Sequence, residues 1–159
     1  MENVNKLKNK IDTKVMNFVL LSVVTGGIYP MMWLFLNQSK LTEEMKSEFV
    51  AKDYPLWLAI VTGFGWLLID VSYAVSDTET ILDHIATLLS VASAVMLIVW
   101  AFKAKSALQA YALNEFKFEL KMNPFYTFIF SIYYIVYCIN DMESELQKHN
   151  VIYRKKIAD

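Results

Sequence analysis

Few residues in this chain could do chemistry, and Asp70 leads them because it lies in a long apolar stretch. A carboxylate near the end of a membrane helix is costly unless it is paired or reaches water. If the chain turns at Asp77 and Thr78, Asp70 lies opposite His84 across a helical hairpin. Two interpretations remain open. Asp70 either reaches water close to the helix end, or it forms with His84 a charged constriction or proton-linked site.

Other reactive groups are sparse, which argues against an enzyme. Asp83 precedes His84, but no third ligand at helical spacing completes a metal site. Cys138 is the single cysteine and is expected to serve in packing. No nucleophile motif, phosphate-binding loop or dinucleotide fingerprint is present. The sequence therefore predicts a non-enzymatic protein without metal or cofactor.

These residues lie within or directly beside four blocks without a charged side chain, at 15–36, 55–69, 85–102 and 124–139. The third has 18 residues, about 27 Å as a helix, close to a hydrocarbon core of about 30 Å. Apolar residues make up 56% of the chain, charged residues 19%, and the mean hydropathy is +0.34. We expect an all-α integral membrane protein with a single membrane domain over 1–159 and segments at about 15–36, 55–75, 81–103 and 123–140.

Charge placement predicts the topology. All 15 Lys and Arg residues lie outside 76–84, which instead carries Asp77, Glu79 and Asp83. The positive-inside rule makes this loop non-cytoplasmic and the two middle segments a transmembrane hairpin. Trp57 and Trp100 then stand at matching depths as expected interface anchors. If both outer segments also crossed, both termini would leave the cytoplasm together with 8 basic residues. The outer segments are thus either spanning, in a four-helix arrangement, or re-entrant, with both termini cytoplasmic.

The first segment contains a helix break at Gly26, Gly27 and Pro30. Half-helices over 15–24 and 31–38 could enter and leave on one face, whereas one kinked crossing helix is the alternative. The fourth segment resembles the first in outline, since an Ile-Tyr pair precedes an aromatic residue and an asparagine in both. The likeness is either an internal repeat or a chance similarity of two aromatic-rich apolar segments. The paired sets are Ile28, Tyr29, Trp33 and Asn37, and Ile132, Tyr133, Tyr137 and Asn140.

Small residues recur every four positions on the third segment at Ala86, Ser90 and Ala94. This spacing allows two membrane helices to approach closely. The partner helix is either the second segment of the same chain or a second copy of the protein, which would make a homo-oligomer.

Two motifs give the chain a resemblance to a known family. The first is Thr25-Gly26-Gly27-Ile28-Tyr29-Pro30-Met31-Met32-Trp33, and the second combines Asn123-Pro124-Phe125-Tyr126-Thr127 with Tyr134, Tyr137 and Ile139-Asn140. They resemble a family of small bacterial multi-span membrane proteins of unknown function, marked by Thr-x-Gly-Ile-Tyr-x-x-x-Trp. Gly26 stands where that family more often has a bulky apolar residue. The resemblance implies a bacterial inner-membrane protein and implies no mechanism.

The function predicted from these features is helix-mediated self-assembly or binding of a membrane-protein partner in a lipid bilayer. The alternative is a small oligomeric ion channel or membrane-perturbing pore, which would use Asp70 and the broken first segment. Nucleic acid is not expected as a partner, because the net charge is -1 and no basic face remains beyond the membrane flanks.

Overall fold

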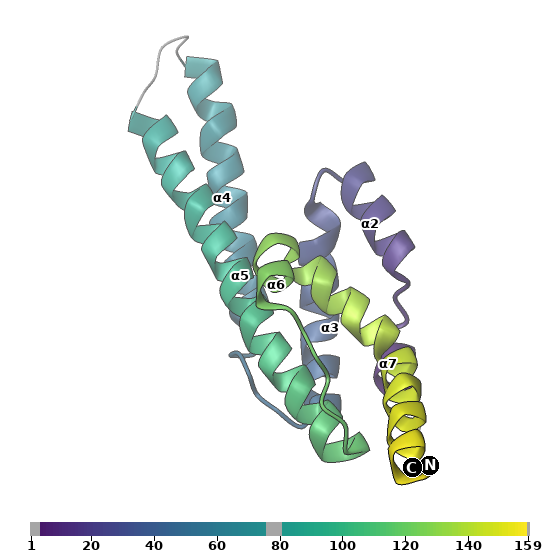
Figure 1. The fold of residues 1–159 in the computed structure, drawn as a ribbon. Coiled ribbons are helices and arrows are strands. Elements are labelled where there is room, and N and C mark those ends of the chain that lie inside the picture. Colours follow the sequence, from purple (N-terminus) through teal and green to yellow (C-terminus); the bar gives the residue numbers. More distant parts are fainter. Residues whose placement is uncertain (1–3, 76–80, 159) are drawn as a thin grey trace.

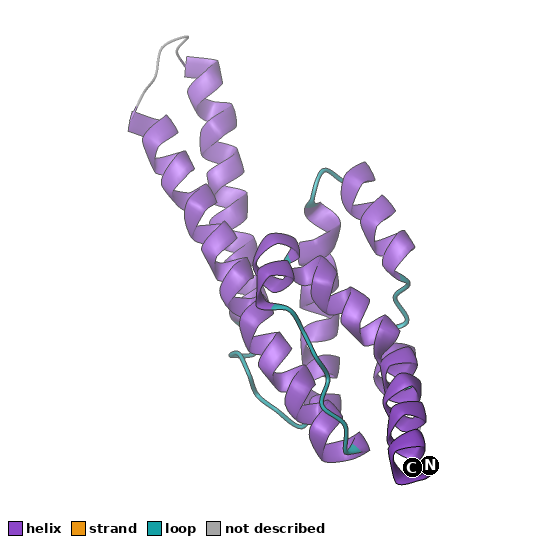
Figure 2. Cartoon of the chain, in the orientation of Figure 1, coloured by secondary structure: helices purple, strands orange, loops and turns teal. Residues whose placement is uncertain are grey.

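A computed structural model describes residues 4–75 and 81–158, and for 153–158 the backbone alone. The fold is all-helical, and the described residues contain no strand (Figure 2). Asp77, Thr78 and Glu79 lie outside the described residues. The helices are α1 (Lys6–Ile11), α2 (Val15–Val24), α3 (Ile28–Met45), α4 (Tyr54–Val75), α5 (Ile81–Phe116), α6 (Pro124–Phe130) and α7 (Ile132–Ala158).

The longest feature is an antiparallel hairpin of α4 and α5, which extends well beyond the other helices (Figure 1). On α4 the buried positions Leu58, Thr62, Gly65 and Ser72 recur at intervals of three, four or seven residues, the spacing of helices packed at a small angle. A Cβ atom added to Gly65 would lie 3.5 Å from Ser90 Oγ on α5. The small residue thus allows the close contact.

Helices α2 and α3 form a second, shorter hairpin (Figure 1). The break predicted in the first segment is present, and its cause is the glycine pair: Gly26 has φ 59° and Gly27 has φ 91°. Both values lie in the left-handed region that favours glycine. The Thr25 hydroxyl accepts the Tyr29 amide proton at 3.0 Å and satisfies a free donor at the start of α3. Pro30 is the third residue of α3, where no intrahelical amide bond is lost.

The fourth segment is broken as well, at Ser131, whose φ is 46°. Asn123 caps the start of α6, and its side chain accepts the Phe125 amide proton at 2.8 Å. The two Ile-Tyr pairs that the sequence repeats occupy equivalent places, since Ile28 begins α3 and Ile132 begins α7. In both outer segments a short helix therefore precedes a break, and a long helix follows it.

Beyond its apolar part α5 continues to Phe116, and a charged, helix-forming stretch makes this continuation possible. The helix ends before Pro124, the next proline in the chain, because Lys117 adopts a left-handed conformation with φ 58°. The chain then runs extended, and Phe118, Leu120 and Met122 are buried while the alternate residues are exposed. Gln109 of α5 donates to the Leu120 carbonyl at 2.9 Å and fixes the segment.

The hydrophobic core lies at the end of the molecule away from the α4–α5 tip. There α1, the second half of α3, the second half of α5 and α7 gather, and both termini lie at this end (Figure 1). Leu41 and Met45 of α3 and Leu108 and Ala112 of α5 are all buried in this core. The apolar side chains in the charged second halves of α3 and α5 therefore pack within the chain.

Candidate functional site

The main surface feature is a large exposed apolar area on α4, α5, α2 and α6. Only 22% of the apolar window of α4 and 17% of that of α5 are buried, although both helices are long and apolar enough to cross a membrane. The core helix of a soluble protein would be mostly buried instead. Exposed side chains on this area include Val23, Val24, Phe64, Leu67, Val71, Leu88, Val91, Phe125, Phe128 and Phe130.

Below this area lies a layer of buried polar contacts, and Thr13 is at its centre. The Trp33 indole of α3 donates to the Thr13 hydroxyl at 2.7 Å, and the Asn140 amide of α7 donates to the Thr13 carbonyl at 2.9 Å. Thr13 in turn donates to the Ile11 carbonyl at 2.8 Å. The layer thus joins the connection between α1 and α2 to both α3 and α7. Within α7, Asn140 also donates to the Val136 carbonyl at 2.9 Å.

A second polar contact joins α3 to α5. The Trp100 indole, which is fully buried, donates to the Gln38 side-chain oxygen at 2.8 Å. The expectation that Trp100 anchors the hairpin at a lipid interface is therefore wrong, because α3 covers it. Trp57 is 56% exposed and donates to Asp53 at 2.9 Å, in keeping with an interface position.

Two further hydrogen bonds reach carbonyls of α5 from other elements. The Tyr54 hydroxyl at the start of α4 donates to the Met96 carbonyl at 2.7 Å, and the Ser131 hydroxyl donates to the Leu97 carbonyl at 3.1 Å. The break between α6 and α7 is thus attached to the middle of α5. Its position is fixed by a specific contact.

Glu44 is a buried carboxylate at the end of α3. Lys6 approaches it at 2.9 Å and Lys10 at 3.4 Å, both from α1. Burial acts to raise the pKa of Glu44, but the hydrogen bonds from Lys6 and Lys10 outweigh it and the pKa lies below its usual value. The charged form is therefore the stable one, and it ties α1 to α3.

The Asp70 and His84 pair is not formed as a direct contact. Both side chains are exposed, and Asp70 has no hydrogen bond or ion pair with any residue in 4–75 or 81–158. Asp70 lies five residues from the end of α4, about 8 Å along the helix axis. That distance agrees with the interpretation in which the carboxylate reaches water near the helix end.

The small residues on α5 do not all share one face. Ala86 is buried and Ser90 lies near Gly65 of α4, but Ala94 is exposed. Steps of four residues rotate the side chain by about 40° each, so Ala94 turns away from the contact line. A four-residue spacing in the sequence does not show this rotation. Small residues spaced by seven would indicate one continuous helix face.

A different small-residue face is free on α4. Ala59 and Gly63 are exposed, four residues apart, and a Cβ atom on Gly63 would meet nothing within 4 Å. Trp66 and Asp70 follow on the same side of the helix at the angles expected for 3.6 residues per turn. The same four-residue spacing of small residues that marks the third segment is present in the second at Ala59 and Gly63, and it is the sequence signal for this face.

A scan against protein families finds a match to the domain of unknown function DUF4234 over residues 13–110. The matched range is more than half of the chain. The chain belongs to the DUF4234 family. No curated protein and no solved structure matches it.

The DUF4234 match begins at Thr13, the centre of the polar layer, and ends within the second half of α5. It includes the α2–α3 hairpin, the α4–α5 hairpin and the exposed α4 face with Gly63. Helices α6 and α7 lie outside the matched range. Within the described part of this DUF4234 chain, no three His, Cys, Asp or Glu side chains gather as a metal site would require.

Proposed function

We propose that this DUF4234 protein is a non-enzymatic membrane protein that acts by helix-mediated assembly. In this proposal α4 and α5 cross the bilayer, while α2–α3 and α6–α7 enter it from one side and return. The observation that supports it is the large exposed apolar area on α2, α4, α5 and α6, together with the buried polar contacts of Thr13 and Trp100 that join the helices beside it. In water such an exposed area would favour aggregation.

Helix lengths support the re-entrant arrangement. Helix α2 has 10 residues and α6 has 7, about 15 Å and 10 Å, so neither could cross a hydrocarbon core of about 30 Å. Helix α3 is longer, but Lys40, Glu43 and Glu44 lie in its second half. The termini then remain on the side of the basic segments, which the positive-inside rule assigns to the cytoplasm. Together with the family resemblance, this favours a bacterial inner membrane.

Cysteine labelling in intact cells tests this topology. In a Cys138→Ser background, Ala74→Cys near the tip of α4 should react with a membrane-impermeant maleimide added outside. Glu48→Cys and Glu119→Cys, both exposed, should react only after permeabilisation. External labelling at position 48 would contradict the orientation of the α4–α5 hairpin, because that loop is cytoplasmic in both the re-entrant and the four-helix arrangement. Asn9→Cys, which is also exposed, separates these two arrangements. External labelling at position 9 would contradict the re-entrant one, because a first segment that crosses places the N-terminus outside.

The assembly part of the proposal depends on the Ala59 and Gly63 face. Small residues four positions apart let helix backbones approach, and membrane helices gain most of their association energy from such close packing. Gly65, two residues further on, already serves the contact with α5. The outward-facing glycine therefore remains for a second copy or another membrane helix.

Gly63→Leu should reduce self-assembly by about tenfold or more, since a bulky side chain holds the two helices apart. The fold should be unaffected, because Gly63 faces open space and leucine favours helix. Sedimentation or mass photometry in nanodiscs would measure the effect. Ala94→Leu, which creates the same side chain at an exposed position on α5 from a residue one carbon larger than glycine, is the control. A wild-type protein that is monomeric at every density in the bilayer would contradict self-assembly.

A pore is the second candidate, and one observation favours it. Asp70 lies on the same side of α4 as Gly63, so an assembly through this face would bring several carboxylates near its axis. The hairpin alone encloses no path. A cation current through reconstituted wild-type assemblies would favour the pore, whereas assemblies without current would favour the assembly function alone.

A further inference from the structure

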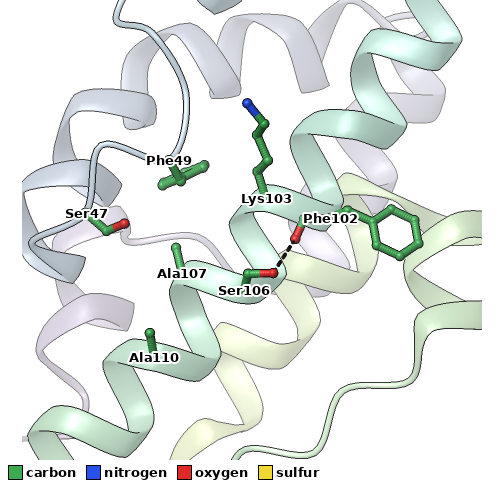
Figure 3. A pocket seen from close by; sticks show the side chains of 7 residues that line it. All are labelled: Ser47, Phe49, Phe102, Lys103, Ser106, Ala107 and Ala110. Carbon is green, nitrogen blue, oxygen red and sulfur yellow. Dashed lines mark hydrogen bonds between the residues drawn. The ribbon is translucent and has the colours of Figure 1, made fainter.

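An open pocket lies beside α5, at the boundary between the exposed apolar area and the core. Its volume is about 450 Å³. Figure 3 shows side chains of α5 on one side and of the segment after α3 on the other. The lining residues are Ser47, Phe49, Phe102, Lys103, Ser106, Ala107 and Ala110.

The polar groups of the pocket suit a phosphate. Lys103 is exposed and forms no ion pair within the described residues. The Ser47 hydroxyl makes no hydrogen bond within the same residues, and the Ser106 hydroxyl donates only to the Phe102 carbonyl at 3.2 Å. Within the described part of the chain, the Lys103 ammonium and the Ser47 hydroxyl are free donors that bind phosphate oxygens, and the Ser106 hydroxyl becomes a third donor when it rotates away from the Phe102 carbonyl. The lining contains no carboxylate that would oppose an anion.

An apolar path leads from the pocket along α5. Val91, Val95 and Val99 are 56%, 53% and 41% exposed, and they recur every four residues above Phe102 and Lys103. Helical geometry places them on the same broad side of α5 as Ser106 and Ala110. A molecule with a phosphate in the pocket could therefore lay a hydrocarbon chain along this stripe.

We propose that the pocket binds the phosphate headgroup of an anionic phospholipid, with an acyl chain along the valine stripe. This inference rests on the proposed membrane location of α4 and α5. A basic group near a membrane surface attracts anionic lipid with an energy that corresponds to about fivefold in affinity. Phe49 and Phe102 supply apolar walls at the level of the glycerol backbone.

The test uses the full chain in nanodiscs of phosphatidylcholine with a minor share of phosphatidylglycerol. After transfer to mild detergent, native mass spectrometry counts the retained phosphatidylglycerol. Lys103→Gln should lower it about fivefold, and Ser106→Leu, which fills the pocket without changing charge, should lower it similarly. Lys121→Gln removes the same charge from an exposed position outside the pocket and should have no effect.

The outcomes separate this inference from the proposed function. Equal retention in wild type, Lys103→Gln and Ser106→Leu would overturn the lipid site while leaving the membrane location intact. A chain that fails to enter nanodiscs would overturn both. Displacement of the lipid by millimolar inorganic phosphate would overturn the assignment to a phospholipid, because the acyl chain would then contribute nothing.

Discussion

Trp100→Ala is expected to destabilise the fold by about 3–5 kcal/mol, as removal of large buried aromatic side chains does. The side chain is fully buried, contacts Phe49 at a ring distance of 6.1 Å and donates to Gln38. The substitution leaves a cavity between α3 and α5 and removes the donor to the Gln38 oxygen. Both effects weaken the attachment of the α2–α3 hairpin to the long helix.

The measurement is a denaturant titration in mild detergent, followed by circular dichroism. Trp100→Phe should cost less, about 1–3 kcal/mol, because it retains most of the apolar volume and loses the hydrogen bond. Trp57→Ala is the matched control on α4 and should cost less than about 1 kcal/mol, since Trp57 is exposed. Equal losses for Trp57→Ala and Trp100→Ala would contradict the buried contact.

The second large effect is expected at Phe18, the fully buried residue that holds α2 in place. Its ring lies 5.6 Å from Tyr29, 5.4 Å from Trp33 and 5.2 Å from Tyr133, in each case edge to face. Phe18→Ala should cost about 3–5 kcal/mol, because edge-to-face contacts add to the burial of the ring. This cost should fall mainly on α2, whose other side chains are largely exposed.

Hydrogen exchange followed by mass spectrometry would locate this effect. Amides of α2 should exchange at least about tenfold faster in Phe18→Ala, while the α4–α5 hairpin should keep its protection. Leu20→Ala shortens a neighbouring side chain that is 56% exposed and should leave exchange unchanged. Faster exchange throughout the chain would mean that α2 unfolds together with the rest, against a separate re-entrant hairpin.

The two outer segments show which helix ends can be predicted from local sequence. The glycine pair ends α2 at Val24, the predicted end of the first half-helix, because consecutive positive φ angles are nearly specific to glycine. The second half-helix begins at Ile28, three residues before the predicted start, since a proline is tolerated in a first helical turn. No glycine or proline in the sequence marks the break at Ser131. In the structure the Ser131 hydroxyl donates to the Leu97 carbonyl of α5 at this break.

The sequence by itself determined the helical class, the long apolar hairpin and the glycine turn, because apolar blocks and backbone propensity are local properties. Only the tertiary structure decided which sides of these helices are covered. Trp57 and Trp100 have similar surroundings in the sequence, yet one is exposed and the other buried. Ala94 leaves the α4 contact and Gly63 faces outward for the same reason. A uniformly apolar helix has no polar face to mark its orientation, so its neighbours fix which side is covered.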